Sequence, residues 1–260
     1  MGLNASESAL NVLRRTPQRV GVFTDFDGTI APIVDDPVTS APLPGAVDAL
    51  AHLVGRVGRV GVLSGRPLEF LEQFFADGVF LAGLYGLEVR DGGNRSREPD
   101  VERWRDVVAA VVSDARRHGP DGVNVEDKGL SLTLHFRRHP DQVDAVAVWA
   151  AEAAQRSGLA VRPARQSVEL HPPVEVDKGT ALVAAAGDLD AVWFIGDDVG
   201  DLAAFVALER LGERGVAVVR CVVTSDELDP VLADHADVTL GGPVSVVTYL
   251  NDLGVVANSG

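Results

Sequence analysis

The order of the predicted elements indicates an α/β fold, a doubly wound and mostly parallel sheet that carries a small inserted α+β domain. Three observations support this prediction. Short apolar strands alternate with helices in residues 20–84, and the same alternation returns in residues 178–219. Between them, residues 90–166 combine helices with strands that alternate apolar and polar residues, which is typical of antiparallel pairing. Acidic, serine or glycine residues follow directly after several of the parallel strands.

The first stretch is predicted to form three strands with helices between them, after a short helix over residues 1–16. β-Branched and aromatic runs predict the strands, and apolar residues three and four apart predict the helices. In chain order we expect a strand from Val20, a loop over Ile30–Pro44, a helix over Pro44–Val54, a strand over Arg59–Leu63, a helix over Pro67–Phe75 and a strand over Val79–Leu84.

The middle stretch is predicted to be the inserted domain. Residues 90–99 are polar and rich in glycine, which indicates a linker, and helices are expected over Glu102–His118 and Gln142–Gln155. Gly122–Phe136 predicts a hairpin that turns at Asp127-Lys128-Gly129, and short strands are expected near residues 159–162 and 167–170. The second arm of the hairpin has one apolar and one polar face: Leu130, Leu132, Leu134 and Phe136 against Ser131, Thr133, His135 and Arg137.

The parallel pattern resumes at Asp177. The remaining expected elements are a helix over Lys178–Ala186, a strand over Ala191–Ile195, a helix up to Leu208 and a strand over Val216–Val219. The predicted division assigns residues 1–89 and 167–260 to one domain and residues 90–166 to the other. Hinges are expected near Gly92-Gly93 and Pro172-Pro173.

The composition excludes several classes of function. With a formal net charge of −15, the 260-residue chain lacks the basic surface that a nucleic-acid partner requires. It contains no apolar run of membrane-spanning length, its N-terminal residues lack the apolar core of a signal peptide, and the lone Cys221 excludes an internal disulfide. We therefore expect a cytoplasmic protein with neither a membrane nor a nucleic acid as partner.

Lysine is rare and occurs twice in the same context. Of 23 basic residues only Lys128 and Lys178 are lysines, and each lies in an Asp-Lys-Gly triplet. Because the net charge would repel an anionic substrate, a phosphate site has to be locally positive, and these two ammonium groups could supply that charge. With only two lysines, chance is the alternative explanation.

The segment Val20-Gly21-Val22-Phe23-Thr24-Asp25-Phe26-Asp27-Gly28-Thr29 places two carboxylates at the end of a buried strand. Asp25 and Asp27 are two residues apart, so on a strand they point to the same side. Two crowded carboxylates repel each other and call for a proton or a cation. This pattern suits a nucleophilic carboxylate beside a general acid/base, and the alternative is a strand followed by an ordinary Asp-Gly turn.

Ser64-Gly65-Arg66 lies between a predicted strand and the start of a predicted helix. Backbone amides, a hydroxyl group and a helix N-terminus together form an anion site, although a simple Ser-Gly turn has the same sequence. In Asp177-Lys178-Gly179-Thr180 the aspartate is an ordinary N-cap, but the helix dipole disfavours a lysine in the first turn. That misplaced charge indicates a function, such as neutralising a phosphate and a carboxylate.

Gly196-Asp197-Asp198-Val199-Gly200-Asp201 contains three carboxylates directly after a buried strand. Oxygen ligands beside a phosphate site indicate Mg²⁺, and helix capping is the alternative. All four segments follow a strand or begin a helix, and in an open α/β sheet such points converge beyond the carboxyl ends of the strands.

Asp25-Phe26-Asp27-Gly28-Thr29, Ser64, Lys178 and Gly196-Asp197-Asp198 together resemble the four-part signature of the haloacid-dehalogenase (HAD) superfamily of phosphotransferases. The resemblance implies a Rossmann-like core in which Asp25 attacks phosphorus and becomes an aspartyl phosphate, while Asp27 serves as acid and then as base. It implies that Ser64 and Lys178, with Gly65 and Arg66, hold the phosphoryl oxygens. It also implies Mg²⁺ bound by Asp25, the backbone carbonyl of Asp27 and Asp197, with Asp198 and Asp201 in auxiliary positions.

More narrowly, the chain is similar to trehalose-6-phosphate phosphatases. The segments that carry this similarity are Ala31-Pro32-Ile33, Leu63-Ser64-Gly65-Arg66-Pro67, Gly83-Leu84-Tyr85-Gly86-Leu87-Glu88, Val125-Glu126-Asp127-Lys128-Gly129, Leu134-His135-Phe136-Arg137 and Val168-Glu169-Leu170. The similarity makes residues 90–166 a cap domain for substrate specificity. It implies that Glu126, Lys128 and Glu169 are candidates for binding sugar hydroxyls, and that Glu88 and His135 are further candidates. Many family members have Thr-Asp-Glu where this chain has Gly200-Asp201-Leu202.

The expected function is Mg²⁺-dependent hydrolysis of trehalose 6-phosphate, a small-molecule sugar phosphate. One alternative is the same chemistry on sucrose phosphate, a glucosylglycerate phosphate or a trehalose-like aminocyclitol phosphate. Another is a non-catalytic phospho-switch of the receiver kind, which also groups acidic residues, a hydroxyl and a lysine on a doubly wound sheet. Asp27 favours the enzyme, because a receiver has no use for an acid/base two residues after its phosphorylated aspartate. In the cap, the alternative is that Lys128 is only a turn residue and that the polar strand face is only solvated.

Overall fold

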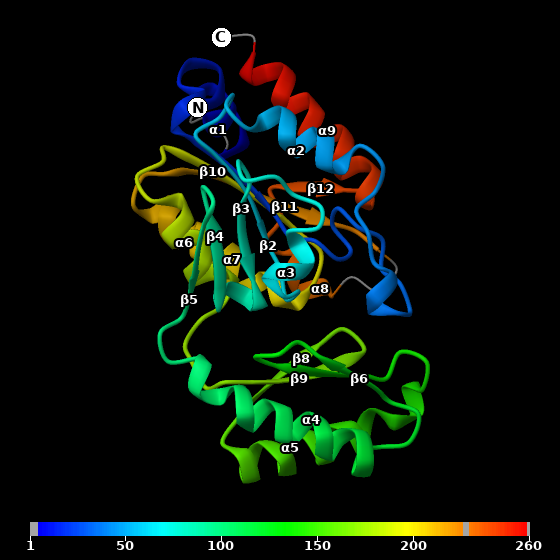
Figure 1. Cartoon of the computed structure of the whole chain (residues 1–260). Helices are drawn as coiled ribbons and strands as arrows, with labels where there is room; N and C mark the ends of the chain where they lie inside the picture. The colour runs from blue at the N-terminus through cyan, green and yellow to red at the C-terminus, as the bar shows by residue number, and fades with distance from the viewer. Residues whose placement is uncertain (1–4, 226–228, 259–260) are drawn as a thin grey trace. The chain divides into compact units, whose positions relative to one another are not determined.

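A computed structural model of the chain describes residues 5–225 and 229–258 (Figure 1). The chain forms two compact units, a larger one built from both ends of the sequence and a smaller one of residues 97–175. Residues 1–4 of the predicted N-terminal helix lie outside the described residues. Within the described ranges, none of the helices is long and apolar enough to cross a membrane.

The larger unit is built on one sheet, whose strand order is β12-β11-β10-β1-β2-β3-β4-β5. The strands from β12 to β3 pair in parallel, and β4 is antiparallel to β3. This arrangement confirms the predicted doubly wound, mostly parallel sheet. The bounds are β1 (Val20–Thr24), β2 (Arg59–Leu63), β3 (Phe80–Gly83), β4 (Glu88–Asp91), β5 (Asn94–Arg97), β10 (Ala191–Gly196), β11 (Ala217–Val223) and β12 (Val238–Leu240).

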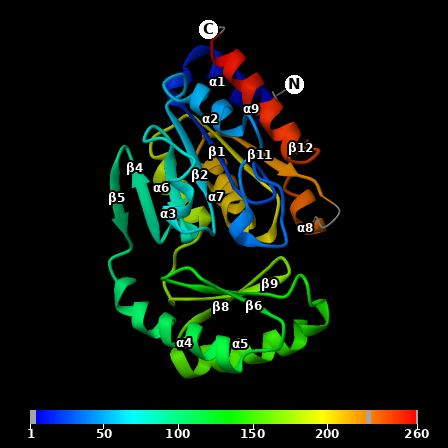
Figure 2. The ribbon, with the colours of Figure 1, turned by 45° about the vertical axis from the view of Figure 1, so that its right-hand side comes forward.

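Helices cover both faces of this sheet, so the central strands are apolar throughout rather than alternating. Val20 and Val22 of β1 lie in one core with α1, α2 and α9, and Phe23 lies in a second core with α6 and α7. Figures 1 and 2 show α2 and α9 side by side. The bounds are α1 (Ala5–Arg15), α2 (Ala46–Leu53), α3 (Leu68–Leu71), α6 (Lys178–Ala186), α7 (Leu202–Glu213), α8 (Pro230–Ala233) and α9 (Pro243–Ala257).

The segment predicted as a linker over residues 90–99 is instead mostly a hairpin. β4 and β5 are joined by Gly92 and Gly93, both at positive φ (52° and 85°), which a two-residue turn of type I′ requires. The prediction was wrong because β5 is polar and exposed along its whole length, so it lacks the alternation that reveals a strand. The glycine pair is therefore a turn inside the larger unit and not at its boundary, where the hinge was expected.

The helix predicted over Pro67–Phe75 is shorter than expected. α3 ends at Leu71, and tighter turns follow it. These turns bring the rings of Phe70, Phe74 and Phe75 around the buried ring of Phe26, with centroids 5.5 to 6.2 Å apart. Aromatic packing thus replaces a continued helix and anchors the residue that lies between Asp25 and Asp27.

The smaller unit is an antiparallel sheet of order β6-β7-β9-β8 with two helices on one face. Side chains of Leu132, Leu134 and Leu170 pack with both helices in one core, as the alternating pattern predicts. Because β9 pairs with β7 and β8, the unit extends to residue 175 and not to 166 as predicted. The bounds are α4 (Arg105–His118), β6 (Asn124–Asp127), β7 (Leu132–His135), α5 (Val143–Ser157), β8 (Ala160–Ala164) and β9 (Ser167–His171).

Candidate active site

Asp25 and Asp27 lie on either side of the anchored Phe26. The backbone N–H of Asp25 continues the sheet by donating to the carbonyl of Ile195 in the neighbouring strand β10 (2.8 Å). Phe26 is fully buried, and Asp25 is 5% exposed. The end of β1 is therefore fixed by the sheet on one side and by the phenylalanine cluster on the other, so the position of Asp25 is rigidly defined.

Lys178 is the centre of the buried charges in the larger unit. Its Nζ donates to Asp25 Oδ1 (2.6 Å) and to Asp201 Oδ1 (2.7 Å), and the residue is 3% exposed. Asp177 caps α6 by accepting the N–H of Thr180 (2.8 Å), which fixes the helix end on which the lysine stands. The two carboxylates compensate an ammonium that the helix dipole disfavours.

The electrostatic environment of this cluster favours a further positive charge. Burial raises the pKa of the Asp25 carboxyl well above its usual value, and Asp201 and Asp197 raise it further against the opposing effect of Lys178. Burial lowers the pKa of the Lys178 ammonium, but Asp201 and Asp25 outweigh burial, so its pKa lies well above the usual value. The lysine therefore stays charged, and a further cation beside Asp25 would favour the ionised form of that carboxyl.

Asp201 shapes the loop after β10. Its Oδ2 accepts the backbone N–H groups of Asp197 (2.8 Å) and Asp198 (3.1 Å), and Asp198 in turn accepts the N–H of Gly200 (2.7 Å). These bonds turn the chain so that the Asp197 side chain meets the end of β1. There, Asp197 Oδ1 accepts from the hydroxyl of Thr29 (3.2 Å), a residue to which the sequence reasoning gave no role.

The close approach of these two loops depends on Gly28. A Cβ atom at this position would lie 2.1 Å from Asp197 Oδ2, and the residue has a φ of 82°. Only glycine satisfies both demands, the left-handed backbone and the absence of a side chain. The glycine of the first segment therefore brings Asp197 to Asp25.

Asp25, Asp197 and Asp201 form a buried group of carboxylates, with one oxygen of each within 4.8 Å of the others. Oxygen donors and excess negative charge fit a hard cation such as Mg²⁺. Both oxygens of Asp201 already accept from protein donors, which favours Asp25 and Asp197 over Asp201 as ligands. The hydrogen bonds of Asp201 reach Lys178 and the backbone of Asp197 and Asp198, and the auxiliary role expected for it stays a prediction.

Ser64 and Gly65 follow β2 and contact the turn over residues 84–86. The backbone N–H groups of Leu84 and Tyr85 donate to the carbonyls of Arg66 (2.8 Å) and Ser64 (2.9 Å). Leu84 and Tyr85 have positive φ values (49° and 62°), which is uncommon for residues other than glycine. Two hydrogen bonds therefore hold the Ser64 loop against this strained turn.

The ring of Tyr85 connects three of the predicted segments. A Cβ on Gly65 would lie 2.8 Å from the Tyr85 hydroxyl oxygen, and one on Gly200 would lie 3.6 Å from the ring. Lys178 Nζ is 5.8 Å from the ring centroid. Tyr85 belongs to a segment that carries the family similarity, but nothing in its spacing predicted this central place.

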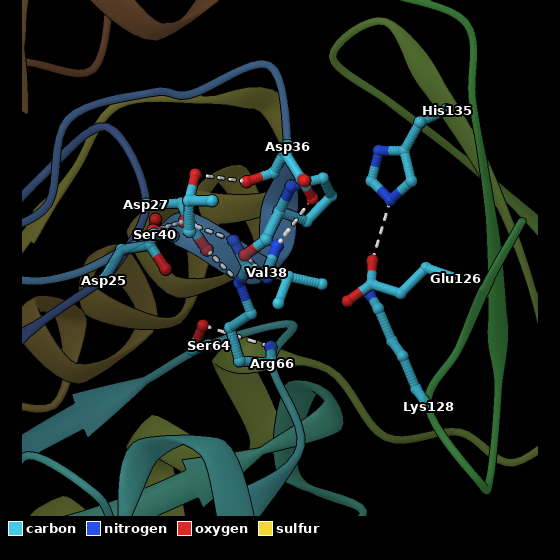
Figure 3. A network of polar contacts seen from close by, with 12 residues as sticks. Asp25, Asp27, Asp36, Val38, Ser40, Ser64, Arg66, Glu126, Lys128 and His135 are labelled. Atoms are coloured by element: carbon cyan, nitrogen blue, oxygen red, sulfur yellow. Dashed lines mark hydrogen bonds and ion pairs between the residues drawn. The ribbon is translucent and has the colours of Figure 1, made fainter. Parts of the chain in front are cut away.

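Arg66 contacts Asp27 through its side chain. The guanidinium donates to both carboxylate oxygens, from Nε to Oδ2 (2.7 Å) and from Nη2 to Oδ1 (2.8 Å), as the dashed lines of Figure 3 show. The hydroxyl of Ser40 donates to the same Oδ1 (2.7 Å). Contacts between side chains and loops thus join all four segments. The guanidinium of Arg66 contacts Asp27 in this structure, and the phosphate-binding role expected for Arg66 from the sequence stays a prediction.

In the smaller unit the register of the sheet aligns four polar residues across the strands. Glu126 lies opposite Thr133, Thr133 opposite Glu169, and Glu169 opposite Arg162. We call Glu126, Thr133, Glu169 and Arg162 the polar row. Because alternate residues of a strand share a face, the row lies on the face opposite the leucine core.

Glu169 contacts several polar side chains on this face. It is 2% exposed and accepts from Ser131 Oγ at Oε1 (2.7 Å) and from Arg162 Nη1 at Oε2 (3.3 Å). Lys128 Nζ lies 3.8 Å from Glu169 Oε1. In the described part of the chain, Thr133 Oγ1 is buried without a hydrogen-bond partner, which is rare for a buried hydroxyl.

The other two residues expected near a sugar differ in their surroundings. His135 Nε2 donates to Glu126 Oε2 (2.7 Å) within the smaller unit (Figure 3). Glu88 belongs to the larger unit, where its Oε2 accepts the N–H of Leu68 (3.0 Å) at the first turn of α3. The structure thus groups His135 with Glu126 and gives Glu88 a helix-capping contact.

Comparison with known proteins identifies the family. The trehalose-phosphatase family model matches residues 23–233, which include all the site residues described above. The chain belongs to the trehalose-phosphatase family. A trehalose-phosphate phosphatase of Mycobacterium ulcerans is 35% identical over 221 residues, which cover 78% of this chain and 54% of the relative. The chain therefore spans about half the length of that relative.

One further relative and one solved structure match over almost their whole length. A probable trehalose-phosphate phosphatase of Sinorhizobium fredii is 31% identical over 270 residues, covering 96% of this chain and 97% of the relative. The C-terminal domain of a Candida albicans trehalose-6-phosphate phosphatase has the same fold, with a TM-score of 0.77 and 23% identity over 98% of this chain and 97% of that one. The HAD-like fold expected from the sequence is thereby confirmed.

Proposed function

We propose that the chain is a Mg²⁺-dependent phosphatase that hydrolyses trehalose 6-phosphate to trehalose and phosphate through an aspartyl phosphate. The observation that carries this proposal is the buried ion cluster: Lys178 bridges Asp25 and Asp201, while Asp27 stands two residues beyond Asp25. Membership of the trehalose-phosphatase family supports the substrate.

In the first step an oxygen of Asp25 attacks phosphorus, and the bond between phosphorus and the sugar oxygen breaks. Asp27 gives its proton to the departing sugar oxygen, so trehalose leaves as a neutral alcohol. Lys178 and the Ser64 loop hold the phosphoryl oxygens in place. Positioning and charge neutralisation are the main contributions a protein makes to phosphoryl transfer.

In the second step a water molecule attacks the aspartyl phosphate, and the ionised Asp27 takes the proton of this water. The bond between phosphorus and Asp25 breaks, which releases phosphate, restores the carboxylate of Asp25 and leaves Asp27 protonated, as it was before the first step. Mg²⁺, held by the carboxylates of Asp25 and Asp197 and the carbonyl of Asp27, would neutralise negative charge on the phosphoryl group. Asp201 and Asp198 would keep Asp197 and Lys178 in position through the hydrogen bonds described above.

The polar row offers the means to recognise a sugar. Carboxylate and cationic groups make strong, directional hydrogen bonds to hydroxyls. Glu126 and Glu169 share one sheet face, and Lys128 Nζ lies 3.8 Å from Glu169. We assign the larger unit to catalysis and the smaller one to substrate specificity. His135 would orient Glu126, and Glu88 would fix the start of α3 through its contact with Leu68.

The test is phosphate release in the presence of Mg²⁺ from trehalose 6-phosphate, sucrose 6-phosphate, glucose 6-phosphate and p-nitrophenyl phosphate. We expect the highest kcat/KM with trehalose 6-phosphate and loss of turnover when a chelator removes the metal. Activity restricted to another sugar phosphate would keep the chemistry and replace the substrate. A stable aspartyl phosphate without turnover would instead support the receiver-type switch.

The cytoplasmic location expected from the sequence stays a prediction, which cell fractionation would test.

A further inference from the structure

The carboxylate of Asp27 is held by two side chains from separate loops. Arg66 donates to both of its oxygens in a fork (2.7 and 2.8 Å), and Ser40 adds a third hydrogen bond at Oδ1 (2.7 Å). Figure 3 shows these two residues approaching the carboxylate from different segments of the larger unit. A forked pair of this kind fixes orientation as well as charge, because both oxygens are placed at once.

The guanidinium of Arg66 is itself immobilised. Its Nη1 donates to the carbonyl of Pro37 (2.8 Å), and its Cζ lies 4.7 Å from the ring centroid of Phe70. The side chain is only 9% exposed. The carboxylate, the carbonyl and the aromatic ring together fix the orientation of the guanidinium. Its Nε and Nη2 donors are therefore directed at both oxygens of Asp27, an arrangement that a lysine in the same place could not provide.

Ser40 is positioned by the local structure of its loop. The residue is 3% exposed and follows the turn over Pro37–Thr39. Asp36 caps this turn by accepting the N–H of Val38 (3.1 Å), and Thr39 Oγ1 donates to the carbonyl of Asp36 (2.8 Å). The loop that carries Ser40 is thus organised by its own hydrogen bonds and by the Arg66 contact to Pro37.

We propose that Arg66 and Ser40 are positioning residues that hold the acid/base Asp27 in its working orientation. This inference rests on the proposed function, in which Asp27 transfers a proton to the sugar oxygen. A carboxylate has about four lone-pair positions, and the three donors occupy two on Oδ1 and one on Oδ2.

Proton transfer to a leaving group gives this arrangement a measurable signature. A sugar alkoxide is a poor leaving group and requires the proton, whereas p-nitrophenolate leaves without one. A misoriented Asp27 should therefore slow hydrolysis of the sugar phosphate far more than that of the aryl phosphate. Loss of a phosphate-binding arginine would instead weaken binding of both esters equally, since both carry the same phosphoryl group.

The experiment compares Arg66→Ala, Arg66→Lys and Ser40→Ala on the sugar phosphate that the wild type prefers and on p-nitrophenyl phosphate. For Arg66→Ala we expect kcat on the sugar phosphate to fall by about 10²-fold, with a much smaller loss on the aryl ester. Arg66→Lys should fall less, because a point charge still holds one oxygen, and Ser40→Ala should fall least. If Arg66→Ala is too unstable to assay, the other two variants decide.

A double-mutant comparison separates this role from a merely structural one. If Arg66 acts through Asp27, then Arg66→Ala should cause almost no further loss on the sugar phosphate in an Asp27→Asn background. Arg220→Ala is the matched control. Arg220 makes a similar fork to Asp237 (2.9 Å at each oxygen) elsewhere in the larger unit, so its loss should affect both esters alike.

Two results would overturn the inference: an equal loss on both esters, or additive losses in the Asp27→Asn background. Either would return Arg66 to phosphate binding or to a purely structural role. These results are distinct from failure of the proposed function, in which the wild type itself would hydrolyse neither the sugar phosphates nor the aryl ester.

Discussion

The two lysines of the chain lie in the same Asp-Lys-Gly triplet, yet their surroundings differ completely. Asp177 caps a helix, and Lys178 starts that helix with contacts of 2.6 and 2.7 Å to two carboxylates. Asp127 ends a strand and accepts the N–H of Gly129 (2.9 Å), whose φ of 78° turns the chain, and the lysine between them lies 3.8 Å from Glu169. The same three residues therefore form a helix start in one unit and a strand turn in the other.

The difference shows what each lysine is suited to do. Lys178 is locked between carboxylates and is suited to neutralise charge at a reacting centre. Lys128 lies 3.8 Å from Glu169, a member of the polar row, which places its ammonium beside the groups proposed to bind the sugar. We therefore expect changes near Lys178 to slow every substrate, and changes near Lys128 to affect only the sugar phosphate. Four predictions test this contrast, from the largest expected effect to the smallest.

Asp25→Asn should lower kcat by at least about 10³-fold on all phosphate esters, because the amide cannot act as the nucleophile. The measurement is steady-state phosphate release, with thermal unfolding as a control for folding. Retained turnover on any ester would remove Asp25 from the role of nucleophile.

Asp201→Asn should lower kcat by roughly 10²-fold on both sugar and aryl phosphates. The amide can accept from Lys178 or from the backbone N–H groups of Asp197 and Asp198, but it cannot satisfy all three as the carboxylate does. A loss confined to the sugar phosphate would contradict the contrast between the two units.

Lys128→Ala should lower kcat/KM for trehalose 6-phosphate by about 10- to 100-fold, the value of a hydrogen bond to a charged group. Hydrolysis of p-nitrophenyl phosphate should change little, since this ester has no sugar to recognise. Arg162→Ala, a change at the same carboxylate, is the comparison variant. An equal loss on both esters would make Lys128 a turn residue only.

Thr133→Val should have the smallest effect, about fivefold in kcat/KM for the sugar phosphate. Valine keeps the shape of the side chain and removes the one buried hydroxyl of the polar row that has no partner among the described residues. We expect no loss of thermal stability, because no hydrogen bond to the protein is broken. An unchanged kcat/KM would show that the hydroxyl does not meet the substrate.

Much of the larger unit follows from local patterns in the sequence. Apolar runs that end in Asp25, Ser64 and Asp197 predicted parallel strands whose carboxyl ends carry the site, and the sheet order bears out that fold. The contact of Lys178 with Asp25 joins residues far apart in the chain, yet it was foreseeable because a lysine at a helix N-terminus calls for a compensating negative charge.

Residues whose position depends on tertiary contacts could not be predicted in this way. Ser40 lies in a proline-rich loop without periodicity, and Tyr85 adopts a backbone conformation that a propensity argument disfavours. The contact between Arg66 and Asp27 was not predicted. A basic residue between a strand and a helix suggests a bound anionic ligand, whereas the anionic group that Arg66 contacts is the side chain of Asp27. The polar row depends on the register of four strands, which alternation alone does not fix.

The close approach of Gly65 to Tyr85 has a consequence for how the family diversifies. Because the tyrosine ring occupies the space of a Cβ at position 65, neither position can change alone without a collision or a gap. The two positions should therefore be inherited as a pair, so that relatives with a side chain at 65 carry a smaller residue at 85. In the laboratory, Gly65→Ala should impair folding or turnover, and a second change of Tyr85 to a smaller residue should restore part of the loss.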